Sequence, residues 1–257
     1  MIEVQDLAKR FVQGRGKKAR TVQAVDRVSW TADDGAITGV LGPNGAGKTT
    51  TLRMVAALIE PDSGRIAVDG IDVARKPREA LARLGVLSDA RGLYPRLTAR
   101  ENIVYYGRLH GMGAEQAAER AETLAQMLEM QALLDRRTEG FSQGERMKTA
   151  LARALVHDPA NIILDEPTNG LDVLATRALR EALRRLRDEH GKCIVFSTHI
   201  MQEVAYLCDR VVLVSHGRTV AEGTVAELNA RAGQTDFEET FVHLAFTDDE
   251  RARGGQS

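Results

Sequence analysis

A glycine-rich segment that ends in lysine and threonine is the part of this sequence best suited to binding phosphate. It fits the pattern G-x-x-x-x-G-K-[ST] in full, and its residues are Gly42, Pro43, Asn44, Gly45, Ala46, Gly47, Lys48 and Thr49. Glycines let the backbone curl so that successive N–H groups face a phosphate oxygen. The pattern predicts that Lys48 contacts the β- and γ-phosphates of a nucleotide and that the Thr49 hydroxyl binds Mg²⁺. Thr50 completes the expected nucleotide-binding set.

The flanking residues decide between a phosphate site and a glycine turn with an incidental lysine. The apolar run ITGVL precedes the segment, and the helical pattern TTTLRMVAAL follows it. A strand before the loop and a helix after it are the context that the motif requires. The helix also directs its positive end at the same anion. We therefore favour the phosphate site.

Two acidic residues, Asp165 and Glu166, follow a second apolar run at residues 161–164. Beside a phosphate loop, Asp165 is suited to binding Mg²⁺, either directly or through another ligand of the ion, and Glu166 is suited to polarising an attacking water. The alternative is that the two charges only cap a strand ahead of Pro167. The phosphate loop favours the first interpretation, and the two motifs together predict a nucleotide phosphohydrolase or a kinase.

Short apolar runs alternate with longer helical patterns along the chain, which predicts an α/β fold. The candidate strands are residues 2–4, 36–41, 65–68, 85–87, 161–164, 192–196 and 210–215. The candidate helices are residues 48–57, 114–130, 143–156, 174–189 and 201–207. Residues 97–158 contain no convincing strand, so we expect a helical insertion there between two strands of the sheet.

Composition and charge exclude several classes of protein. The 257 residues carry 35 Lys and Arg against 36 Asp and Glu, a balance that argues against bulk nucleic acid as a partner. Cys193 and Cys208 lie in otherwise apolar runs. We therefore interpret them as core residues of a protein in a reducing compartment. No run approaches 18 apolar residues, and the first ten residues lack the apolar stretch of a signal peptide. The chain is expected not to span a membrane by itself.

Two polar stretches are predicted to be surface or disordered segments. Residues 14–20 (GRGKKAR) predict a basic turn between two early strands. A nucleic-acid patch is the alternative for this turn, but the run lacks aromatic residues and the net charge is −1. The tail from residue 247 to residue 257 is polar, charged and glycine-containing, so we expect it to be disordered.

Further motifs distinguish among nucleotide-binding proteins. The N-K-x-D motif expected of a GTPase does not occur, and no segment suggests the acceptor site of a small-molecule kinase. Instead, FSQGE (residues 141–145) starts a helical pattern, TNGLD (168–172) follows the acidic pair, and STH (197–199) ends the next apolar run. With the phosphate loop and the acidic pair, these motifs stand in the order found in ATP-binding cassette (ABC) ATPases. The sequence resembles that family from about residue 4 to residue 223.

The resemblance implies a particular architecture. It implies a P-loop NTPase ABC-ATPase fold with a RecA-like core, a small N-terminal antiparallel β subdomain and a helical subdomain near residues 90–158. These parts would make up an ABC ATPase domain over residues 1–223. Residues 224–257 would form a C-terminal extension with the disordered tail.

The resemblance also implies a substrate, ATP, with Mg²⁺ as cofactor, and roles for particular residues. Glu166 and His199 would be catalytic, His199 as the family's switch histidine at the γ-phosphate. Phe11 occupies the place of an aromatic residue that stacks on adenine. Ser142 and Gly144 occupy the place of donors that contact ATP on the phosphate loop of a second protomer.

Three positions depart from the family pattern. Gln143 and Glu145 replace the first glycine and the glutamine of the usual LSGGQ motif. Asp89 stands where the family has the glutamine of its glutamine loop. A carboxylate there can bind Mg²⁺ but adds negative charge beside the γ-phosphate. We therefore expect Asp89 to act as a metal ligand with Thr49 and Asp165, and to alter the metal dependence.

Several segments narrow the resemblance to one branch. LSDARGLYPRLTAREN (residues 87–102), FSQGE with ALARALVHDP (150–159) behind it, and DFEETF (236–241) are similar to sodium-export (NatA-type) ATP-binding subunits. The resemblance implies an ATPase that powers export through a separate membrane permease, which would dock around residues 91–96. It also implies pairing with a second protomer, expected to be identical, and a peripheral location at the cytoplasmic face of the membrane.

The cargo and the alternatives to transport stay open at this point. Na⁺ is the first candidate cargo, and a drug, an antibiotic or a lipid is the alternative. A non-transport ABC protein of translation or DNA repair would normally show two cassettes or a long coiled-coil insertion, and neither occurs here. A regulatory module that hydrolyses nothing is disfavoured by the intact set of Lys48, Asp165, Glu166 and His199.

Overall fold

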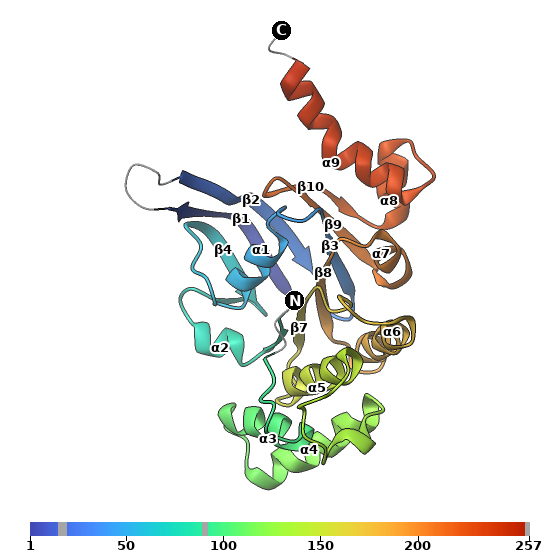
Figure 1. Cartoon of the computed structure of the whole chain (residues 1–257). Helices are drawn as coiled ribbons and strands as arrows, with labels where there is room; N and C mark the ends of the chain where they lie inside the picture. The colour runs from blue at the N-terminus through green and yellow to red at the C-terminus, as the bar shows by residue number, and fades with distance from the viewer. Residues whose placement is uncertain (15–19, 89–91, 255–257) are drawn as a thin grey trace.

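The fold is built on two β-sheets. The computed structural model describes residues 1–14, 20–88 and 92–254. The larger sheet has the order β10-β9-β3-β8-β7-β6 (Figure 1), in which β10 runs antiparallel to β9 and the other five strands are parallel. Its strands are β3 (Ile37–Leu41), β6 (Leu84–Leu87), β7 (Asn161–Asp165), β8 (Cys193–Thr198), β9 (Arg210–Ser215) and β10 (Arg218–Gly223).

The smaller sheet is antiparallel and has the order β2-β1-β4-β5. Its strands are β1 (Ile2–Gln13), β2 (Arg20–Ala32), β4 (Ser63–Val68) and β5 (Ile71–Asp72). Helix α1 (Lys48–Val55) shares one buried apolar cluster with both sheets, through Leu52, Met54 and Val55. This packing fixes α1 directly behind β3, whose five residues are all buried.

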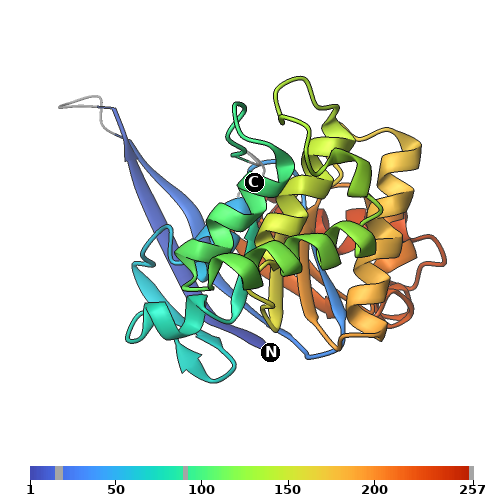
Figure 2. The ribbon, with the colours of Figure 1, turned by 90° about the horizontal axis from the view of Figure 1, so that it is seen from below.

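The described residues between β6 and β7 form helices and loops, together with one isolated bridge between Thr98 and Arg137. After the short helix α2 (Pro77–Leu81) and β6 come α3 (Ala99–Leu109), α4 (Ala114–Met127), a 3-10 turn (Gln131–Leu133) and α5 (Gln143–Leu155). Helices α3, α4 and α5 gather at the end of the molecule opposite α9 and lie together in front of the larger sheet when seen from below (Figures 1 and 2). Ala121, Leu124, Met147 and Leu151 bury their shared face.

The four C-terminal helices are α6 (Val173–Asp188), α7 (Met201–Leu207), α8 (Val225–Ala232) and α9 (Phe237–Gly254). Helices α8 and α9 cover the β9–β10 edge, whereas α6 packs against α5 and β8. Phe237, Phe241 and Ala245 are buried together with Leu228 and strand residues of β9. The sequence analysis predicted disorder over residues 247–257. For residues 247–254 this is corrected, because α9 continues to Gly254 and projects beyond the sheets (Figure 1), and residues 255–257 lie outside the described residues. The run Glu250-Arg251-Ala252-Arg253 consists of good helix formers, which outweighs its polarity.

The N-terminal strands are longer than the predicted residues 2–4. The β1–β2 pairing shifts register between Val4 and Leu7 and again between Lys9 and Arg10. Asp6 and Arg27 have φ angles of 47° and 59°. These bulges break the strict alternation by which a strand is recognised in a sequence. Of the basic turn predicted at residues 14–20, residues 15–19 lie outside the described residues.

No helix in the described ranges has the length and apolar character needed to cross a bilayer.

Candidate functional site

The candidate site is a cavity of about 650 Å³ at the carboxyl ends of the central parallel strands. Strand β3 leads into the glycine-rich loop, β7 ends at Asp165, and β8 ends one residue before His199. The cavity is lined by Phe11, Val22, Gln23, Ala24, Asn44, Gly45, Ala46, Gly47, Lys48, Thr49, Thr50, Glu166, Asn169 and His199. The structure thus brings together most of the predicted nucleotide-binding residues with the predicted catalytic pair.

The loop that precedes α1 requires glycine at particular positions. Gly45 and Gly47 have φ angles of 82° and 100°, which favour glycine. A Cβ atom on Gly42 would lie 2.2 Å from the carbonyl oxygen of Val214, and one on Gly47 would lie 2.5 Å from that of Ala24. The loop therefore takes a tight curl that exposes its N–H groups at the start of α1, the arrangement expected of a phosphate cradle.

Lys48 is the cation at the base of this cradle. Its side chain is only 5% exposed, and Nζ donates to the carbonyl oxygens of Gly42 (2.7 Å) and Pro43 (3.2 Å). Nζ also lies 3.5 Å from Oε1 of Glu166. The loop itself therefore holds the ammonium group in place, and a phosphate can join these partners without a large movement of the lysine.

Asp165 and Thr49 form the part of the site that fits a magnesium ion. The Thr49 hydroxyl donates to Oδ1 of Asp165 over 3.0 Å, and the Asp165 side chain is buried. No ammonium, guanidinium or imidazole of the described residues forms an ion pair with this carboxylate. A buried carboxylate without a cation, next to a hydroxyl, is a donor set of hard oxygens that suits Mg²⁺, which takes its other ligands from phosphate and water. The third predicted ligand, Asp89, lies outside the described residues.

Glu166 and His199 contact each other at the mouth of the cavity. The Nδ1 atom of His199 lies 2.9 Å from Oε2 of Glu166. Glu166 has a φ of 48°, rare for a non-glycine residue. Its carbonyl oxygen accepts from the N–H of Asn169 at 3.1 Å. The left-handed backbone turns the chain sharply after β7, and the carboxylate then meets Lys48 on one side and His199 on the other.

The far wall of the cavity comes from the smaller sheet. Phe11 lines it with 36% of its surface exposed, and Nζ of Lys9 lies 5.8 Å from the centre of its ring. An exposed aromatic face beside a phosphate cradle suits stacking on a planar base. Val22, Gln23 and Ala24 of β2 line the same wall. Sequence reasoning missed these three, because only the pairing of β2 with β1 carries them to Phe11.

Ser142 and Gly144 are not among the residues that line this cavity. Ser142 caps α5: its hydroxyl accepts from the N–H of Glu145 at 3.2 Å, and its own N–H donates to the Glu145 carboxylate at 2.8 Å. That N–H, with help from Arg136, lowers the pKa of Glu145 below its ordinary value. Glu145 thus replaces the usual glutamine as the partner in a capping box.

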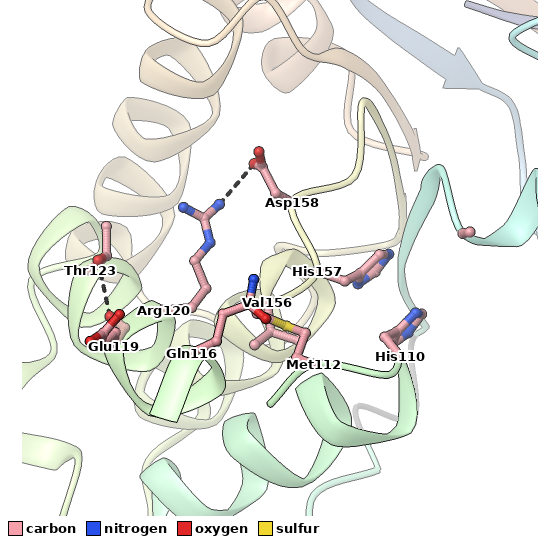
Figure 3. Close-up of a pocket in the computed structure, with 10 residues that line it drawn as sticks. His110, Met112, Gln116, Glu119, Arg120, Thr123, Val156, His157 and Asp158 are labelled. Carbon is pink, nitrogen blue, oxygen red and sulfur yellow. Dashed lines mark hydrogen bonds and ion pairs between the residues drawn. The ribbon is translucent and has the colours of Figure 1, made fainter. Parts of the chain in front are cut away.

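A second cavity, of about 440 Å³, lies between α4 and the ends of α3 and α5 (Figure 3). The rings of His110 and His157 stack in it with centroids 3.7 Å apart, and Arg120 pairs with Asp158 at 2.8 Å. Burial, followed by the neighbouring His110, lowers the pKa of His157 to about 4. Neither a glycine-rich loop nor, among the described residues, a group of three metal-ligating side chains is found here. We assign no ligand to it.

Comparison with known proteins identifies the family. Residues 25–169 match the ABC transporter family, more than half of the chain. The ABC transporter ATP-binding protein NatA of Bacillus subtilis (strain 168) is 43% identical over 94% of this chain and 97% of its own length. The chain belongs to the ABC transporter family. The Nod factor export ATP-binding protein I of Paraburkholderia xenovorans (strain LB400) is 41% identical to this ABC protein over 84% of this chain and 71% of its own length.

The solved structures agree with this family. A dimeric bacterial ABC transporter cassette has a TM-score of 0.78 at 26% identity, over 87% of this chain and 98% of its own. The predicted α/β P-loop fold is therefore confirmed. The chain is an ATP-binding subunit of exporter type and an ATPase, and ABC ATPases of this kind work as dimers with a membrane permease.

Proposed function

We propose that this ABC subunit hydrolyses ATP at the cavity of Lys48 and Glu166 to drive Na⁺ export through a separate membrane permease. The contact of Glu166 with both Lys48 and His199 carries the hydrolytic part of the proposal. It sets a carboxylate beside the cation that would hold the γ-phosphate, at 3.5 Å, and fixes its other oxygen to an imidazole at 2.9 Å. Similarity of the segments at residues 87–102 and 236–241 to sodium-export subunits supports the cargo.

In the proposed reaction, the loop N–H groups and Lys48 bind the phosphates of ATP and orient the γ-phosphate. Thr49 and Asp165 would hold Mg²⁺, which would supply positive charge to neutralise the phosphates of ATP. Glu166 orients the attacking water and accepts its proton while the water oxygen bonds to the γ-phosphorus and the bond from that phosphorus to the β-phosphate oxygen breaks, which releases phosphate and ADP. His199 keeps the Glu166 carboxylate aimed at that water through its contact at Nδ1.

We place the second protomer at the open side of the cavity. Ser142 is exposed at the first turn of α5, and neither it nor Gly144 lines the cavity of its own chain. The N-terminus of α5 would then direct the positive end of a helix at a phosphate of another chain. ATP would then join two copies of this chain, and hydrolysis would release them.

The permease would dock beside the segment that enters α3. A cavity of about 290 Å³ is lined there by Gly92, Leu93, Pro95, Thr138, Glu139, Gly140 and Arg146. The N–H of Glu139 donates to the carbonyl oxygen of Pro95 (2.9 Å), and the Thr138 hydroxyl donates to that of Tyr94 (2.9 Å). Tyr94 and Pro95 are thus hydrogen-bonded to the stretch that leads into Ser142. Movement of a permease at residues 92–95 would reach the N-terminus of α5 through these bonds. Of the predicted docking segment, Arg91 lies outside the described residues.

The test is transport with purified components. The subunit is purified from membranes of its own host together with the permease that it retains, and the complex is reconstituted into vesicles. We expect ATP-dependent movement of ²²Na⁺, lost in a complex made with Lys48→Met. ATPase activity stimulated by the permease, with movement of a lipid or drug but not of Na⁺, would overturn the sodium assignment and leave the ATPase assignment intact. Absence of a retained membrane protein would overturn the permease assignment.

A further inference from the structure

Ser197, near the end of β8, is a fully buried hydroxyl that the mechanism above does not use. Its Oγ donates to Oδ1 of Asp165 over 2.6 Å and accepts from the N–H of Glu166 at 3.0 Å. One side chain therefore contacts both the residue expected to hold Mg²⁺ and the residue expected to activate water.

The contact with Asp165 follows from the sheet. Ser197 and Asp165 are neighbours in the parallel pairing of β8 with β7. Oδ1 of Asp165 accepts from two hydroxyls, those of Ser197 and Thr49. Thr49 is itself an expected metal ligand, so its hydroxyl oxygen would turn to the ion. The hydroxyl of Ser197 would then keep the Asp165 carboxylate in its orientation. A hydrogen bond to an ionised carboxylate in a buried place is among the stronger ones.

The contact with Glu166 concerns the backbone. Glu166 has a φ of 48°, a conformation that costs energy unless neighbouring groups hold it. Its N–H donates to Ser197, and its C=O accepts from Asn169. Without the hydroxyl, that N–H would lose its partner, and the turn that aims the carboxylate at Lys48 and His199 would loosen.

From these contacts we propose that Ser197 is a positioning residue of the ATPase site, which couples the orientation of Asp165 to that of Glu166. It touches neither substrate nor the reacting atoms. The inference rests on the proposed roles of Asp165 in binding Mg²⁺ and of Glu166 in activating water. Its consequence is that metal affinity and catalytic rate change together when the Ser197 hydroxyl is removed.

The chain offers a matched control for this hydroxyl. Ser215 ends β9 of the same sheet, it is also buried, and its Oγ has no hydrogen-bond partner in the described part of the chain. Ser197→Ala and Ser215→Ala therefore remove the same atom from similar surroundings. Ser197→Thr keeps a hydroxyl and serves as the conservative variant. Thermal unfolding of each variant reports whether it folds, and Ser197→Cys, a weaker donor of similar volume, replaces the threonine variant if that one does not.

Two readouts apply. ADP binding is measured by calorimetry with Mg²⁺ and with EDTA, and ATP turnover is measured against Mg²⁺ concentration. For Ser197→Ala we expect the gain in ADP affinity from Mg²⁺ and kcat each to fall about 10- to 100-fold, the size expected for loss of one buried charge-assisted hydrogen bond. ADP affinity in EDTA should be unchanged. Ser197→Thr should recover both quantities, and Ser215→Ala should match the wild type.

The failures can be told apart. If Glu166→Gln abolishes turnover but Ser197→Ala resembles Ser215→Ala in both readouts, the inference about Ser197 is overturned. If Ser197→Ala lowers kcat without changing the effect of Mg²⁺, the coupling to Asp165 is overturned. If Glu166→Gln turns over normally, the proposed base is wrong, and the ADP measurement alone decides whether Ser197 supports the metal ligand.

Discussion

Replacing Glu166 by glutamine separates the binding of ATP from its hydrolysis. Glutamine keeps the shape of the side chain and an oxygen that can accept from His199, but it removes the negative charge 3.5 Å from Nζ of Lys48 and the base that would accept a proton from water. Loss of a positioned general base costs about 10²- to 10⁴-fold in rate. We therefore expect the kcat of Glu166→Gln to be lower than that of the wild type by about 10²- to 10⁴-fold.

The same substitution should strengthen ATP binding. Glu166 lies beside the Lys48 ammonium group, which would also bind the γ-phosphate of ATP. The negative charge of Glu166 therefore repels the γ-phosphate. Two unit charges about 4 Å apart interact by about 4 kcal/mol at an effective dielectric of 20. Contact with solvent at the mouth of the cavity reduces this repulsion to roughly 1–2 kcal/mol. ATP affinity should then increase roughly 5- to 30-fold.

The assay combines phosphate release, calorimetry with ATP and size-exclusion chromatography in MgATP. The variant should bind ATP tightly, release little phosphate and elute as a dimer, because the ATP that joins two protomers is not consumed. Glu181→Gln, which removes an exposed carboxylate from α6, is the control and should behave as wild type. Turnover within threefold of wild type, or ATP affinity that is unchanged or weaker, would refute the assigned role of Glu166.

Three further predictions test other parts of the structure. Phe11→Ala should weaken ATP binding roughly 5- to 30-fold, because stacking on a base contributes about 1–2 kcal/mol. In a phosphate-release assay, its kcat at saturating ATP should stay within twofold of wild type. Gly42→Ala should abolish ADP binding by calorimetry, because its Cβ would lie 2.2 Å from the Val214 carbonyl oxygen. Burial lowers the pKa of His157 to about 4, from about 6.5 in the unfolded chain. The unfolded state therefore binds a proton more readily, and the free energy of unfolding falls as the pH drops from 6.5 toward 4. Allowing for partial exposure, urea unfolding at pH 5 should show about 1 kcal/mol of that loss, absent in His157→Asn; an equal loss in the variant would contradict it.

The sequence was sufficient to predict the parts of the site that are contiguous in the chain. The glycine-rich loop and the acidic pair each need their residue types within a few positions, because the chemistry of one phosphate site is local to one strand end. Phe11 was found only through the resemblance to a family, since nothing in its neighbours points to a nucleotide. The nucleotide-facing residues of β2, such as Gln23, could not be found, because register shifts in β1 and β2 obscure both strands.

The role of Ser197 shows a different limit. Asp165 and Ser197 are 32 residues apart, and only the pairing of β7 with β8 makes them neighbours. Periodicity predicts that each run is a buried strand, but it does not predict the order of strands in a sheet. Contacts between strand ends, which decide how the two carboxylates are held, therefore depend on topology that a single sequence does not contain.

That topology also explains why the end of β8 is central to the site. In the sheet order β9-β3-β8-β7, β8 separates the strand that leads to the phosphate loop from the strand that carries the two carboxylates. Glu166 must therefore reach Lys48 across the end of β8. Each of the three residues at the end of β8 holds a different part of the site. Ser197 holds the acidic pair, the Thr198 carbonyl oxygen accepts from the N–H of Gly42 at 3.4 Å, and His199 holds the Glu166 carboxylate. A small displacement of these three residues would separate base, metal ligand and phosphate loop at once, so a partner that moved the end of β8 would change hydrolysis without touching ATP.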